Sequence, residues 1–94
     1  GSMSEQIVPI PGIQLEAISP ANRKKYEIPE NVRGVVVNKS NGETETFKEG
    51  VVLVEINGTQ ILSVDDVSEN LYSGINRFYV WYRGKYRLLA YRIT

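Results

Sequence analysis

The chain has 94 residues, enough for one domain with a modest hydrophobic core. Its 11 basic and 11 acidic side chains cancel, so no overall charge draws the protein to nucleic acid or to an anionic membrane. Cysteine and histidine are both absent, which excludes disulfides, thiolate nucleophiles, the usual zinc ligand sets and a Ser-His-Asp triad within this chain. No apolar run approaches the roughly 18 residues of a membrane-spanning helix, and we expect neither a metal nor a cofactor.

The first ten residues differ in composition from the rest. Gly1-Ser2-Met3 is typical of a cleaved expression tag, and the following residues are polar with a lone proline. We interpret residues 1–10 as a tag remnant and linker, and place the domain at residues 11–94. The lack of cysteine suits the cytosol and the periplasm equally.

The first half of the domain shows strand and helix signals in alternation. Residues 13–17 alternate apolar and polar side chains, the period of a half-buried strand. Ser19-Pro20 supplies an N-cap and an N1 proline for a short helix over residues 21–26, which Ile28-Pro29 ends. Residues 34–37, a glycine followed by three β-branched valines, predict a central strand buried on both faces.

The middle of the chain contains a loop and a hairpin. We predict a loop with one helical turn over the polar residues 39–50, where Asn41-Gly42 is a turn signal and Phe47 the apolar anchor. Strands over residues 51–56 and 59–62 flank Asn57-Gly58, a dipeptide that tolerates positive φ at both centres of a type I′ turn.

A second helix and a second hairpin complete the pattern. Ser63-Val64-Asp65-Asp66 has the form of a capping box, and Gly74 stands where a C′ glycine belongs, so we predict a helix over residues 64–73. Residues 78–82 and 86–93, joined at Gly84, predict an antiparallel pair. The order of elements predicts a small, antiparallel-rich α+β domain.

Three of these local patterns, in this order, resemble a PDZ domain in the circularly permuted bacterial arrangement. Pro11-Gly12-Ile13-Gln14-Leu15 resembles the loop and strand that hold a ligand's C-terminal carboxylate. Residues 50–58, which end in Val54-Glu55-Ile56-Asn57-Gly58, resemble the segment that usually reads GDVIVEVNG. Residues 63–67, followed by Leu71, resemble the start of the helix that forms the other wall of the groove.

Two further segments resemble the PDZ domains of HtrA/Deg-type serine proteases. Residues 19–30 are similar to the insertion TPE-R-YGLPE of those proteases, and residues 81–93 are similar to their final strands. The resemblance implies the C-terminal PDZ domain of a periplasmic protease of protein quality control. It also implies a small antiparallel β-sandwich or partly open barrel with one main helix and one short helix.

The family resemblance implies binding of extended or C-terminal peptide segments by β-augmentation, in which the ligand adds a strand to the sheet. The first strand would supply main-chain hydrogen bonds, and the helix would close the side-chain pocket. The expected peptide-binding residues are Gly12, Ile13, Gln14, Leu15, Ala17, Val64, Val67, Ser68 and Leu71. Proline at position 11 departs from the family pattern, because it brings no N–H to the carboxylate loop. The expected partners are peptides or unfolded segments and the protease and sister PDZ domain of a parent chain, with the isolated domain monomeric.

Other interpretations of single features remain open. Any one apolar residue of this set is compatible with a place in the core. Residues 77–92 interleave arginine and lysine with aromatic side chains, which fits a structural hairpin, a protein-docking surface beside a vestigial groove, or a nucleic-acid stacking surface. The neutral charge of the chain disfavours the last. Asp65 and Asp66 are explained by helix capping rather than by catalysis or metal binding.

Overall fold

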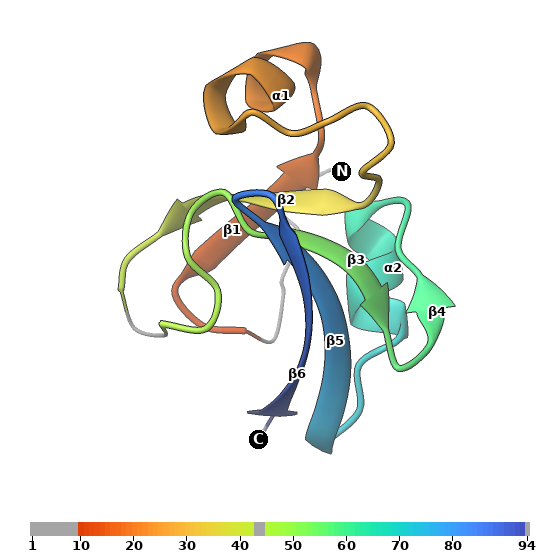
Figure 1. Cartoon of the computed structure of the whole chain (residues 1–94). Coiled ribbons are helices and arrows are strands. Elements are labelled where there is room, and N and C mark those ends of the chain that lie inside the picture. Colours follow the sequence, from red (N-terminus) through yellow and green to blue (C-terminus); the bar gives the residue numbers. More distant parts are fainter. Residues whose placement is uncertain (1–9, 43–44, 94) are drawn as a thin grey trace, which may run out of the picture.

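The computed structural model describes residues 10–42 and 45–93, which form a small α+β domain with two short helices and a six-stranded sheet (Figure 1). The elements in chain order are β1 (Ile13–Ala17), α1 (Pro20–Tyr26), β2 (Val35–Ser40), β3 (Val52–Ile56), β4 (Thr59–Gln60), α2 (Val64–Glu69), β5 (Gly74–Tyr82) and β6 (Lys85–Ile93).

All strand pairs of the sheet are antiparallel. The strands lie in the order β1-β2-β3-β5-β6, and β4 pairs with β3 off this path. β1 and β6 are therefore the two ends of this path. The prediction of an antiparallel-rich α+β domain is confirmed.

The sheet has apolar side chains packed on both faces. Val35 and Val37 join the larger core cluster, whereas Val36 between them joins a smaller cluster around Trp81. Successive side chains of a strand point to opposite faces, so these three fully buried valines confirm that β2 is central. In the larger cluster, Phe47 packs edge-to-face on its neighbour Phe78 with ring centroids 5.0 Å apart, as expected of the loop's anchor.

A close backbone contact fixes the start of β2. Gly34 has φ of 146°, and a Cβ placed on it would lie 2.1 Å from the carbonyl oxygen of Leu53. Only glycine fits this approach of β2 to β3.

The local signals at α1 have the expected effects. The Oγ of Ser19 accepts a hydrogen bond from the N–H of Asn22 at 3.1 Å, and Pro20 occupies the first helical position. The helix ends at Tyr26, because Glu27 adopts a left-handed conformation and Ile28 donates its N–H to the Arg23 carbonyl at 2.9 Å. Figure 1 shows α1 at one end of the molecule, away from α2.

Both predicted hairpin turns are present. Asn57 and Gly58 have φ of 53° and 86°, as a type I′ turn requires, and Arg83 and Gly84 have 48° and 86°. The strand before the second turn is longer than expected, since it begins at Gly74 rather than at residue 78.

Further boundaries differ from the sequence predictions, among them the end of β4, which stops at Gln60 instead of residue 62. The second helix ends at Glu69 instead of residue 73, because Asn70 leaves the helical conformation and its side chain donates to the Asp66 carbonyl at 2.7 Å. β2 continues to Ser40, and the described residues of the following loop contain no helix. Ile10, which we placed in the linker, is fully buried in the larger core cluster. Residues 1–9 lie outside the described part of the chain.

Candidate functional site

The outer edge of β1 is the first feature of the candidate site. β1 pairs with β2 on one side, and no strand of the described residues lies on its other side. The Gly12 carbonyl accepts a hydrogen bond from the Asn41 N–H, at the end of β2, at 2.9 Å. The C=O and N–H of a trans peptide unit point in opposite directions. The N–H of Ile13 therefore points away from β2, toward the open edge.

Hydrogen bonds of β2 lead to the same alternation. Val37 donates its N–H to Val51 and accepts at its carbonyl from Gly50, both at 2.8 Å, so its main chain faces β3 rather than β1. Its neighbour Val36 must then face β1, where it stands opposite Glu16. Glu16 accordingly turns its main chain toward β2, and the residues on either side of it face the open edge.

Three residues of β1 thus direct their main-chain groups outward: Ile13, Leu15 and Ala17. The carbonyl of Ala17 already accepts a hydrogen bond from Asn22 Nδ2 of α1, at 3.4 Å, so the free acceptors of this row are those of Ile13 and Leu15. The register shifts between Gln14 and Leu15, but the extra residue, Asn38, belongs to β2, so the alternation along β1 continues. Unpaired N–H and C=O groups in a row are a template for another strand.

α2 provides the second wall, since it packs beside β1. Ile13 and Leu15 of β1, Val64 of α2 and Leu71 after it are half-buried and all pack against the larger core cluster. These four predicted residues are therefore partly exposed and pack on the same core, as the walls of a groove between the strand edge and the helix would.

The remaining predicted site residues have different positions. Val67 is fully buried and belongs to the core on which these four residues pack. The side chains of Gln14, Ala17 and Ser68 are exposed. Gly12 has φ of 83°, a left-handed backbone conformation that favours glycine where the chain enters β1.

A capping box fixes the start of α2. Asp66 accepts hydrogen bonds at Oδ2 from the N–H groups of Leu62 and Ser63, at 2.9 and 3.1 Å, and donates its own N–H to Ser63 Oγ at 3.4 Å. This confirms the predicted capping box, and one carboxylate of the Asp65-Asp66 pair is engaged in it.

Asparagine side chains fix the end of α2, which the sequence reading missed. Asn76 is fully buried; its Oδ1 accepts from the Tyr72 N–H at 2.9 Å, and its Nδ2 donates to the Tyr72 and Gly74 carbonyls at 2.7 and 3.1 Å. Asn57 donates from Nδ2 to Asn76 Oδ1 and to the Asn70 carbonyl, both at 2.8 Å. The network ties the exit of α2 to β3 and β5. The signal for this network in the sequence is Asn76 itself, a polar residue at the first of the alternating buried positions of β5.

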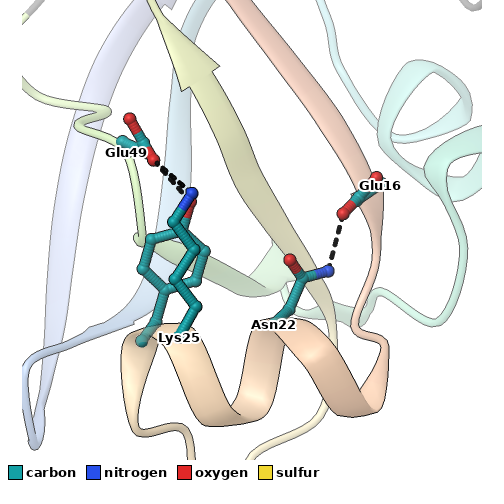
Figure 2. Close-up of polar contacts among 5 residues, drawn as sticks. Glu16, Asn22, Lys25 and Glu49 are labelled. Carbon is teal, nitrogen blue, oxygen red and sulfur yellow. Dashed lines mark hydrogen bonds and ion pairs between the residues drawn. The ribbon is translucent and has the colours of Figure 1, made fainter.

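A second candidate lies between α1 and the β5–β6 turn. It is a hollow of about 770 Å³ whose lining includes Lys25, Tyr26, Glu49, Trp81 and Arg83. Figure 2 shows Lys25 reaching from α1 toward Glu49, and Asn22 reaching toward Glu16 of β1. These contacts attach α1 to the rest of the domain.

The polar cluster in this hollow shifts three ionisation equilibria. The Tyr26 hydroxyl donates to Glu49 Oε2 at 2.6 Å, and Lys25 Nζ lies 3.3 Å from the same oxygen. The Tyr26 hydrogen bond, followed by that from Lys25, lowers the pKa of Glu49 below its ordinary value of 4.5. The hydrogen bond to Glu49 raises the pKa of Lys25, and burial followed by the same carboxylate raises the pKa of Tyr26.

We expect Tyr26→Phe to raise the pKa of Glu49 toward 4.5, because the largest cause of its depression is removed. A carboxyl group whose pKa is lowered by folding stabilises the fold at pH values above its ordinary pKa. This stabilisation is lost as the pH falls through the pKa of the folded state. The side-chain carbonyl of Glu49, followed by NMR from neutral to acid pH, measures the shift. Tyr72→Phe, at an exposed tyrosine elsewhere, is the matched control and should leave the midpoint unchanged. An equal midpoint in wild type and Tyr26→Phe would contradict the assignment.

Residues 10–42 and 45–93 contain no group of three or more metal-ligating side chains. Across these ranges the helices are too short or too polar to cross a membrane. No protein-family model matches the sequence, and a search of the curated proteins finds no match.

Proposed function

We propose that this chain is a peptide-binding domain of the PDZ type, which takes an extended peptide as an added strand along the outer edge of β1. The observation that supports this most is the row of outward main-chain groups along β1, namely the N–H groups of Ile13, Leu15 and Ala17 and the carbonyls of Ile13 and Leu15. Partly exposed apolar side chains of β1 and α2 accompany this row. Main-chain bonds provide affinity in this mode, and these apolar side chains select those of the ligand.

The C-terminal end of the ligand lies at the loop before β1 in this proposal. The Ile13 N–H is directed to the open edge there. Pro11 contributes no donor. The loop therefore holds a terminal carboxylate with fewer N–H groups than a loop without proline.

The proposal extends to the parent protein. The insertion that forms α1 and the strand order support a C-terminal PDZ domain of an HtrA/Deg-type serine protease, acting in the periplasm in protein quality control. The domain itself is non-catalytic in this proposal, and it holds substrate tails or controls assembly of the protease. A glycine-flanked serine with upstream histidine and aspartate in the sequence before Met3 would support this origin; a different upstream domain would contradict it.

We expect a peptide with an apolar, free C-terminal residue to bind with a Kd on the order of 10 μM or weaker, about −7 kcal/mol, since main-chain pairing is exchanged with solvent. Amidation should weaken binding only severalfold, because Pro11 has already removed one donor. An NMR titration should shift the amides of Ile13–Ala17 and of α2. Shifts confined to residues 77–94, or none at millimolar peptide, would contradict the proposal.

Two matched pairs sharpen this test. Leu71→Glu places a charge beside the partly exposed apolar side chains of β1 and α2 and should abolish binding, whereas Tyr72→Glu, at an exposed neighbour, should not. The second pair does not depend on a folded variant: the peptide is N-methylated at one of two adjacent residues. Methylation of the N–H that faces β1 should abolish binding, and methylation of the next N–H should preserve it. Equal binding of both methylated peptides would exclude strand addition.

A further inference from the structure

β6 is a second open edge of the sheet. It has nine residues, and among residues 10–42 and 45–93 no strand pairs with its outer side. From Lys85 to Leu88 every side chain is exposed. A long open edge is usually protected by charged side chains or covered by a partner.

The β5–β6 hairpin carries a strong local charge in a neutral chain. The hairpin contains five basic residues and no acidic residue. The rest of the chain contains six basic and eleven acidic residues. Among the described residues the one ion pair joins Lys25 to Glu49, so none involves a cation of the hairpin; Glu55 is the carboxylate that shares a hollow with Arg77. The five cations are Arg77, Arg83, Lys85, Arg87 and Arg92.

The exposed half of β6 separates charge and apolar surface onto its two faces. Lys85 and Arg87 project on one face, whereas Tyr86 and Leu88 project on the other. Leu88 is 70% exposed, and Tyr86, which is 42% exposed, stacks on Tyr79 with ring centroids 5.2 Å apart. If a peptide strand paired with this edge, every second side chain of the peptide would lie beside the cations of β6, and the side chains between them would lie beside its apolar groups.

The apolar face continues into a hollow across the neighbouring strands. The hollow has a volume of about 510 Å³, and its lining includes Ile75, Tyr79 and Leu88 together with Glu55 and Arg77. Ile75 is 56% exposed, so side chains of a bound strand have further apolar surface to cover.

We propose that the Lys85–Leu88 edge of β6 pairs with an extended acidic segment of another protein, in which carboxylates alternate with apolar side chains. The free edge requires a partner with main-chain amides, and the exposed cations Lys85 and Arg87 select carboxylates on one face of it. Nucleic acid fits less well, because it offers no strand to the edge and Glu55 lies in the adjoining hollow. This edge is separate from β1, so its use does not depend on the function proposed above.

The probe is a blocked octapeptide of alternating glutamate and valine, which has no free carboxyl terminus. We expect its titration into the labelled chain to shift the amides of residues 85–92 and to produce cross-strand NOEs to β6. Arg87→Glu should weaken binding by about tenfold or more, because a like charge then faces the ligand carboxylate. Leu88→Glu should weaken it as well, through the other face. Lys48→Glu, at an exposed cation outside the hairpin, should have little effect.

The competing explanations give different results. A peptide of the same composition with its glutamates grouped in one block should bind at least about tenfold more weakly. Equal binding of the two peptides, or a single-stranded oligonucleotide that displaces the peptide from the same amides, would overturn the proposal in favour of a general polyanion surface. Concentration-dependent shifts at residues 85–88 without peptide would overturn it in favour of a second copy of this chain. Shifts at β1 instead of β6 would also overturn it.

Discussion

Trp81→Ala is expected to lower the free energy of unfolding by about 3–5 kcal/mol. Trp81 is only 3% exposed and belongs to the smaller core cluster. Its indole packs there with the aliphatic side chains Ile28, Val32, Val36 and Val52. Truncation leaves a cavity between the sheet and the segment after α1, in addition to the lost burial.

Denaturant unfolding followed by circular dichroism measures this loss, since the substitution removes the only tryptophan. Leu88→Ala, at a side chain on the same hairpin that is 70% exposed, should change stability by less than about 0.5 kcal/mol. A Trp81→Ala protein as stable as the wild type would show that the indole does not support the fold, and would restore its interpretation as a docking residue.

Asn76→Ala is expected to cost about 2–4 kcal/mol, although it removes little volume. The substitution leaves the Tyr72 N–H, the Tyr72 and Gly74 carbonyls and one Asn57 N–H without their partner in a partly buried environment. Since this network holds the exit of α2, peptide affinity at β1 should also fall in whatever fraction remains folded.

Asn31→Ala, at an exposed asparagine in the loop before β2, provides the control and should be nearly neutral. The two variants lose the same atoms, so their difference measures burial and hydrogen bonding alone. A loss below about 1 kcal/mol for Asn76→Ala would mean that water replaces the side chain in this network.

The sequence predicts the parts of this fold that depend on local chemistry. The Ser19 and Ser63 caps, the Asn57-Gly58 turn and the valines of β2 all have the predicted structures, because their signals act over a few neighbouring residues. The alternation of Ile13 and Leu15 likewise predicts β1.

Features that depend on distant contacts are not predictable in this way. The helical spacing of apolar residues continues to residue 71, but α2 ends at Glu69. Hydrogen bonds of Asn57 and Asn76, which are distant from each other in the sequence, hold the chain where it leaves the helix. The same periodicity placed Val67 in the site, whereas tertiary packing buries it in the core. Which edge of β1 remains open is likewise set by the pairing with β2.

Amide hydrogen exchange along β1, with and without a saturating free-acid peptide, tests the central proposal most directly. The proposal predicts that exchange slows at Ile13, Leu15 and Ala17, whose N–H groups face the open edge, while Gln14 and Glu16, directed to β2, change little. A period-two pattern of this kind requires a peptide paired with the edge. Unchanged exchange at all three outward residues, in a sample in which the peptide is bound, would contradict strand addition at β1.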